Sequence, residues 1–111
     1  MSERYDRGTV VKGPDLFADH PHRPYVCLSD DSHLYSDEEA LYAASTTTRR
    51  AIAIPLGDDD FATGGLPFET YVNPWTVVTI RHADIVEQEG HLIDPTTETI
   101  AEETAGYLGL Q

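Results

Sequence analysis

The sequence has a single cysteine, so no disulfide can form within the chain. This favours an intracellular, cytoplasmic setting, because small domains in oxidising compartments commonly rely on disulfides. Cys27 lies between Val26 and Leu28, which predicts a buried packing role rather than a reactive thiol. Long hydrophobic runs are also missing, since the longest, from Ala51 to Leu56, is far shorter than the roughly 20 residues of a membrane helix. The opening segment is charged, so we expect neither a signal peptide nor a membrane span.

Basic residues are scarce, and lysine is almost absent. Lys and Arg together number 7 against 20 Asp and Glu, which gives a net charge of -13, and Lys12 is the one lysine. Because 40% of the residues are hydrophobic, the chain should fold rather than behave as a disordered acidic tail. An acid excess with so little lysine indicates a halophilic protein adapted to multimolar salt; an ordinary acidic protein is the alternative. The charge by itself argues against a nucleic-acid partner.

The acid excess is regional, however. Residues 1–29 carry as many basic as acidic side chains, whereas residues 30–111 carry three arginines against sixteen acids. Arg23 directly precedes an apolar segment, and Arg49 and Arg50 directly follow three threonines. Two strand ends could therefore bring guanidinium groups and hydroxyls to one edge, a combination that suits phosphate because guanidinium donates paired hydrogen bonds. The alternative is that these arginines are surface partners of the many acids.

Turn-forming residues recur at short intervals, which favours a small, mainly β domain. We expect strands over residues 9–11, 24–29, 40–47, 50–56, 75–81 and 90–93. Residues 15–23 are expected to form a loop and 61–67 a flexible connection, with one short helical turn within 82–90.

The C-terminal segment predicts the one helix. Asp94 is placed as its N-cap, Pro95 at its first position and Gly109 at its end, with an apolar stripe formed by Ile100, Ala101, Ala105 and Leu108. With 111 residues the chain is long enough for one domain only. The expected fold is mainly β (α+β), a partly open barrel of five to seven strands with a C-terminal helix.

Familiar catalytic and metal-binding motifs are missing. Phosphate-binding loops, serine-hydrolase elbows and zinc-protease helices have no counterpart in the sequence. His20 and His22 have a spacing that could present two imidazoles, but no second pair of ligands accompanies them, so we expect no metal site and no cofactor. The run Asp58-Asp59-Asp60 is expected to be a solvated loop.

Several short motifs occur in a familiar order. They are Arg7-Gly8-Thr9-Val10-Val11, Arg23-Pro24 with the apolar segment to Asp31, Ala43-Ala44-Ser45-Thr46-Thr47, Val78-Thr79-Ile80-Arg81 and Gly90-His91-Leu92. In order and spacing the sequence resembles the MazF/PemK-like toxins of type II toxin–antitoxin systems, and the likeness spans residues 1–111 as a single domain. Thr46-Thr47-Thr48, Asn73-Pro74-Trp75 and His82-Ala83-Asp84-Ile85 are similar to the haloarchaeal branch of that family.

The resemblance implies an SH3-like barrel and a function. Family members are metal-independent endoribonucleases, which cut single-stranded RNA by attack of a 2′-hydroxyl on the adjacent phosphorus. They are generally homodimers and are neutralised by an antitoxin. We therefore expect single-stranded RNA, a cognate antitoxin and a second copy as partners, with no membrane and no DNA contact by this chain alone.

The resemblance also implies a catalytic pair, Arg23 and Thr46. A guanidinium suits the stabilisation of charge on the phosphorane oxygens, and a threonine hydroxyl can hold the scissile phosphate in line. Thr46 and Thr47 point to opposite faces while the strand persists, so only one of them should reach the site, and Thr47 is the alternative. Substrate binding is expected from Thr47, Arg49, Arg50 and His22.

Two further expectations concern affinity and the competing functions. Bases could stack on an aromatic side chain such as Phe17, Tyr25 or Phe61. The alternative function is a catalytically silent SH3-like module that binds RNA or protein, and a third is an acidic protein–protein adaptor.

Overall fold

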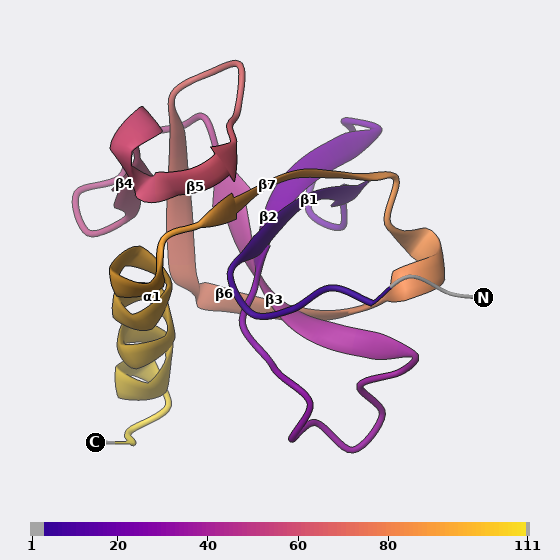
Figure 1. Cartoon of the computed structure of the whole chain (residues 1–111). Coiled ribbons are helices and arrows are strands. Elements are labelled where there is room, and N and C mark those ends of the chain that lie inside the picture. The colour runs from indigo at the N-terminus through magenta and orange to yellow at the C-terminus, as the bar shows by residue number, and fades with distance from the viewer. Residues whose placement is uncertain (1–3, 111) are drawn as a thin grey trace.

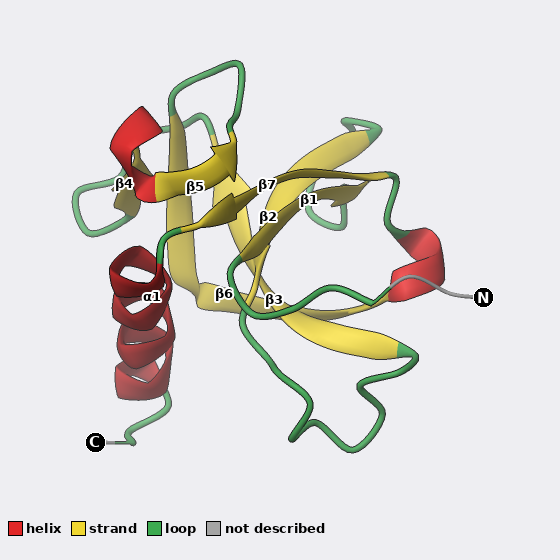
Figure 2. Cartoon of the chain, viewed as in Figure 1, coloured by secondary structure: helices red, strands yellow, loops and turns green. Residues whose placement is uncertain are grey.

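The structure is a computed structural model that describes residues 4–110, so the first three residues of the charged opening segment lie outside the described part. Between residues 4 and 110 it contains seven strands and one α-helix (Figure 1, Figure 2). The strands are β1 (Thr9–Pro14), β2 (His22–Cys27), β3 (Glu39–Thr46), β4 (Ile54–Leu56), β5 (Phe61–Gly64), β6 (Thr70–Arg81) and β7 (Glu87–Leu92). The helix is α1 (Asp94–Tyr107), and two 3-10 turns, Asp58–Asp60 and His82–Asp84, complete the list.

The strands form one antiparallel sheet in the order β4-β6-β3-β2-β1-β7-β5. The sheet curls strongly into a half-barrel, and α1 lies beside β6 (Figure 1). This confirms the prediction of a mainly β, partly open barrel with a C-terminal helix.

The central strands are buried on both faces because their apolar residues do not alternate with polar ones. Neighbouring residues belong to different core clusters: Val10, Val26 and Ala43 pack in one, whereas Val11, Tyr25 and Tyr42 pack in the other. This arrangement makes the β2–β3 pair the rigid centre of the domain. The well-packed core therefore holds the side chains at the ends of these two strands in place.

Helix α1 packs against the sheet through an unexpected face. Ile100 is fully buried, as predicted, but its neighbours in the buried stripe are Thr97 and Thr104, while Leu108 is 70% exposed. The Thr104 hydroxyl donates a hydrogen bond to the backbone oxygen of Pro74 in β6, at 2.7 Å. The predicted apolar stripe was therefore partly wrong. The helix packs against β6 through the hydrogen bond of Thr104, whereas Leu108, predicted to be buried, is exposed.

Several predicted strands and connections differ from the structure, and β2 begins two residues earlier than predicted, at His22. The segment predicted as a strand over 50–56 is a turn with a strand only at 54–56, and residues 61–67, predicted as a flexible connection, contain β5. Gly64, which suggested flexibility, instead allows the backbones of β5 and β7 to approach each other closely. It has φ +67°, and a Cβ there would lie 2.2 Å from the backbone oxygen of Glu89. The strand predicted from Trp75 begins five residues earlier, at Thr70, and runs through Pro74.

Cys27 is buried, and burial raises the pKa of its thiol to about 12. This confirms the predicted packing role. The short helical turn expected within 82–90 is the 3-10 turn His82–Asp84.

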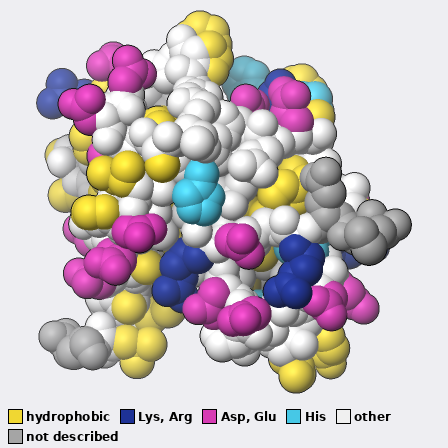
Figure 3. Space-filling model, viewed as in Figure 1, with side chains coloured by type: hydrophobic (Ala, Val, Ile, Leu, Met, Phe, Trp, Pro, Cys, Tyr) yellow, Lys and Arg dark blue, Asp and Glu magenta, His cyan; other side chains and the backbone are white. Residues whose placement is uncertain are grey.

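On the surface, acidic side chains are spread across the face shown in Figure 3, and the Lys and Arg side chains are confined to a few spots. Among residues 4–110, no helix is long and apolar enough to cross a membrane.

Candidate active site

Arg23 and Thr46 lie at the adjoining ends of two neighbouring strands. Strands β2 and β3 pair antiparallel, with Tyr25 opposite Ala44. The same register continued by two residues places Arg23 opposite Thr46, and residues opposite each other in an antiparallel pair project from the same face. The sheet therefore presents the two side chains together.

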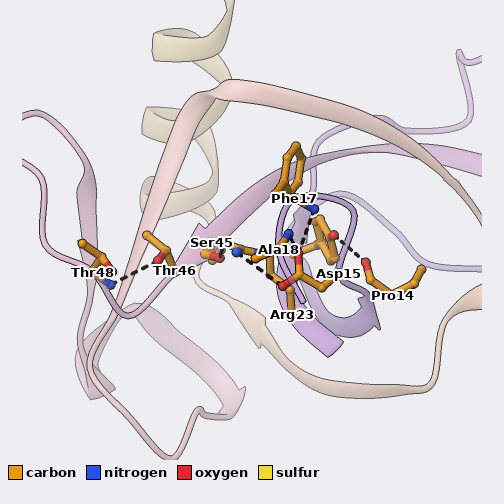
Figure 4. A network of polar contacts seen from close by, with 9 residues as sticks. Pro14, Asp15, Phe17, Ala18, Arg23, Ser45, Thr46 and Thr48 are labelled. Atoms are coloured by element: carbon orange, nitrogen blue, oxygen red, sulfur yellow. Dashed lines mark hydrogen bonds and ion pairs between the residues drawn. The ribbon is translucent and has the colours of Figure 1, made fainter. Parts of the chain in front are cut away.

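The Arg23 guanidinium is fixed by three hydrogen bonds (Figure 4). Its Nε donates to Asp15 Oδ1 at 3.0 Å, its Nη2 donates to Asp15 Oδ2 at 3.5 Å, and its Nη1 donates to the Ser45 backbone oxygen at 3.0 Å. The Phe17 ring lies over the guanidinium, with 5.5 Å from Arg23 Cζ to the ring centroid. Because a guanidinium has five N–H bonds, these contacts leave one on each terminal nitrogen for a ligand.

Asp15 accepts most of the hydrogen bonds in this network. Its carboxylate, 1% exposed, also accepts hydrogen bonds from the backbone N–H groups of Phe17 and Ala18, at 2.9 and 3.2 Å. Burial by itself raises the pKa of Asp15, but the hydrogen bonds from Phe17, Arg23 and Ala18 outweigh it and hold the pKa below its ordinary value. Asp15 thus stays ionised, folds the loop after β1 and orients Arg23.

Thr46 is the last residue of β3, and its hydroxyl is oriented by the turn that follows. The backbone N–H of Thr48 donates to Thr46 Oγ1 at 3.1 Å. Since this bond uses a lone pair of the oxygen, the hydroxyl proton stays available for a phosphate oxygen.

A cavity of about 330 Å³ opens beside Arg23 and Thr46. We call it the Thr46 pocket; its lining residues are Phe17, Arg23, Ala44, Thr46, Thr48, Arg50, Asn73, Trp75 and Thr76. This lining combines two guanidinium groups, three threonines, an amide and two aromatic rings, and it contains neither a carboxylate nor an imidazole. It offers donors for a phosphate and flat surfaces for a base.

The other predicted substrate-binding residues lie elsewhere. Thr47 and His22 line a separate, more apolar cavity of about 150 Å³, which Phe68 also borders. Arg23 lines both cavities, whereas Arg49 faces a third one. Of the residues predicted to surround the phosphate, the structure therefore brings Arg23, Thr46 and Arg50 into one pocket.

Asn73 and Trp75 line the pocket but were not predicted as site residues. Ala43 pairs with Val77 and Ala44 with Asn73, so residues 74–76 of β6 bulge out of the ladder. Bulges beside active sites commonly re-aim side chains, and this one turns Trp75 and Thr76 into the Thr46 pocket. The sequence does contain a signal for this bulge, because a proline such as Pro74 inside a strand-like segment indicates a bulge or an edge strand.

Of the three aromatic residues expected to stack on bases, only Phe17 lines the Thr46 pocket. Tyr25 is fully buried in the core and its hydroxyl donates to the backbone oxygen of Pro14. Phe61 packs against the core from β5. The second aromatic ring that lines the Thr46 pocket is that of Trp75.

A larger depression, of about 620 Å³, lies elsewhere, beside Arg4 and Arg7. Those two arginines pair with Asp37 and Asp30, and no threonine or aromatic side chain lines the depression. In residues 4–110 there is also no group of three or more His, Cys, Asp or Glu side chains placed to hold a metal ion. The Thr46 pocket is therefore where we place the candidate active site.

Known structures share this fold. An endoribonuclease from a mycobacterial species superimposes with a TM-score of 0.75 and 24% identity, covering 98% of this chain and 95% of its own. An endoribonuclease in complex with its cognate antitoxin, also mycobacterial, gives 0.76 and 21%, covering 98% and 97%. A MazE–MazF complex from Deinococcus radiodurans gives 0.71 and 13%, covering 98% and 99%.

No protein-family model and no curated protein matches the sequence. At the identities of these solved structures the likeness is one of fold. Along almost its whole length, the chain has the fold of the MazF toxins.

Proposed function

We propose that this protein is a MazF-type endoribonuclease toxin, which cleaves single-stranded RNA by attack of a 2′-hydroxyl on the adjacent phosphorus. The bond from phosphorus to the 5′-oxygen breaks, which leaves a 2′,3′-cyclic phosphate and a 5′-hydroxyl; the 2′-hydroxyl gives its proton to water and the 5′-oxygen takes one from water. The observation that carries the proposal is the convergence of Arg23 and Thr46 on one pocket. The fold adds support, because solved structures with the same fold are named endoribonucleases. The runner-up is an SH3-like module that binds RNA or protein without cutting it.

The roles follow from the hydrogen bonds. The two N–H bonds that Arg23 has left would donate to the non-bridging oxygens, where negative charge grows as the phosphorane forms. The Thr46 hydroxyl would donate to the same phosphate and hold it in line for attack. Arg50, from the rim of the pocket, would neutralise a neighbouring phosphate. This scheme needs no metal ion.

The outlying residues would act on the flanking RNA. Thr47 and His22, which line the smaller cavity together with Arg23, would contact the RNA beyond the scissile phosphate. Arg49 would add a more distant phosphate contact. We further propose a cytoplasmic homodimer that is neutralised by an antitoxin, as one solved structure of this fold is bound to its cognate antitoxin.

The test of the proposal is cleavage of defined single-stranded RNAs in concentrated KCl with a chelator present. The wild type should cut RNA, and replacing the 2′-hydroxyl before the cut site by hydrogen should stop the reaction. Thr46→Val removes the hydroxyl at nearly constant volume and should slow cleavage by about 10- to 100-fold, as expected for the loss of one hydrogen bond to a charged group.

Thr79→Val is the matched control, since it makes the same change at an exposed position of β6 that lines none of the cavities described above. It should retain most of the activity. A wild type that binds RNA libraries across a range of salt concentrations without cutting them would replace the proposed function by the binding module.

We propose also that the acidic surface is an adaptation to salt, as in the haloarchaeal branch. Self-repulsion of a -13 charge is weakly screened in dilute buffer, so the free energy of unfolding should rise as KCl is added. Thermal denaturation across a KCl series measures this, with sucrose as an uncharged control. Full stability in dilute buffer would count against the halophilic explanation.

A further inference from the structure

The bulge in β6 provides the Thr46 pocket with side chains that the proposed chemistry does not use. Asn73 and Trp75 line the pocket, yet neither is needed to bind a phosphate. The bulge takes residues 74–76 out of the backbone pairing between β3 and β6. Its position next to Arg23 and Thr46 suggests a role in recognition.

Trp75 is held in place from the helix side. Its ring meets the ring of Tyr107 edge-on, with centroids 5.6 Å apart and an interplanar angle of 71°. The neighbouring Pro74 accepts the hydrogen bond from Thr104. Helix α1 thus fixes the bulge, and the indole is presented as a preorganised aromatic surface beside the pocket.

Asn73 carries an unused acceptor. Its Oδ1 is buried without a hydrogen-bond partner among the described residues. A buried polar atom left unpaired is costly and calls for an explanation. The final torsion of an asparagine side chain is soft, so a small rotation can turn this oxygen toward a donor that enters the pocket.

We propose that the Thr46 pocket also holds a nucleobase next to the scissile phosphate, stacked on Trp75, with its exocyclic amino group donating to Asn73 Oδ1. This inference rests on the proposed function for the identity of the ligand. Adenine and cytosine carry such an amino group on the edge opposite the sugar, and uracil does not. Asn73 is then a specificity-determining residue and Trp75 its stacking platform.

Trp75 is the only tryptophan of the chain, so its fluorescence reports on this pocket directly. The probes are short 2′-fluoro oligonucleotides of adenine, cytosine or uracil, which lack the attacking hydroxyl and cannot be cut. Titration should quench the fluorescence, and the adenine and cytosine oligonucleotides should bind about fivefold more tightly than the uracil one, the value of one hydrogen bond.

Asn73→Leu should bring that ratio close to one while the quenching persists. Gln88→Leu, the same type of change at an exposed position of β7, should leave the ratio as it is. Trp75→Leu should weaken all three oligonucleotides by about tenfold or more, measured by the anisotropy of a labelled strand. Circular dichroism checks that each variant is folded.

The outcomes separate this inference from the proposed function. Binding without a change in Trp75 fluorescence, no binding, or an unchanged base preference in Asn73→Leu would each overturn the inference, even if the wild type cleaves RNA. Conversely, quenching with the expected base preference in a protein that cuts no RNA would uphold the base site and overturn the nuclease.

Discussion

Replacing Arg23 by lysine should lower the rate of RNA cleavage by about 10²- to 10³-fold, the cost of removing a donor aimed at developing charge. Lysine keeps the positive charge but loses the planar fork. A guanidinium can bond Asp15, the Ser45 backbone oxygen and a phosphate at the same time, whereas an ammonium has three donors at one point. The measurement is the single-turnover rate with saturating enzyme, so that weaker binding does not mask the chemical step.

Arg49→Lys is the control for charge and side-chain type. Arg49 is exposed and faces a different cavity. Its replacement by lysine should therefore lower the cleavage rate far less than the replacement of Arg23. An Arg23→Lys variant that is folded and as fast as the wild type would remove Arg23 from the reaction, and with it the main support for the nuclease.

The family resemblance implied the pair Arg23 and Thr46, and the alternation of side chains along strands explains why the two lie on the same face of the sheet. Thr46 and Thr47 were expected to point to opposite faces, and Thr46 ends β3 two residues after Ala44, which lies opposite Tyr25. Local patterns of this kind survive in the fold because the core fixes which face is buried.

Contacts between distant or irregular segments could not be anticipated in the same way. Asp15 lies in a loop whose sequence has no periodicity, and its partners are set by the turn that it forms with Phe17 and Ala18. The bulge after Asn73 depends on α1, which holds Pro74 from thirty residues further along the chain. Strand β5 likewise exists only because β7 pairs with it.

Asp15→Asn should lower the free energy of unfolding by about 3 kcal/mol, toward the low end of the cost of breaking a buried ion pair because Arg23 is 17% exposed. The variant keeps the shape of the side chain but leaves the guanidinium without its counter-charge. It should also slow cleavage, since Arg23 loses its orientation. Chemical denaturation in concentrated KCl measures the stability, and Asp19→Asn, an exposed position in the same loop, is the control.

The pH dependence distinguishes a lost ion pair from a merely altered loop. Because the pKa of Asp15 is lower in the folded chain than its ordinary value of 3.8, its ionisation stabilises the fold fully above that value, and the contribution is lost as the pH falls through the folded pKa. The wild type should therefore lose stability across this acid range more steeply than Asp15→Asn, so that the two curves converge as the pH falls. A constant difference between them would mean that the carboxylate charge contributes nothing, and Arg23 would then owe its position to the Ser45 backbone oxygen and the Phe17 ring.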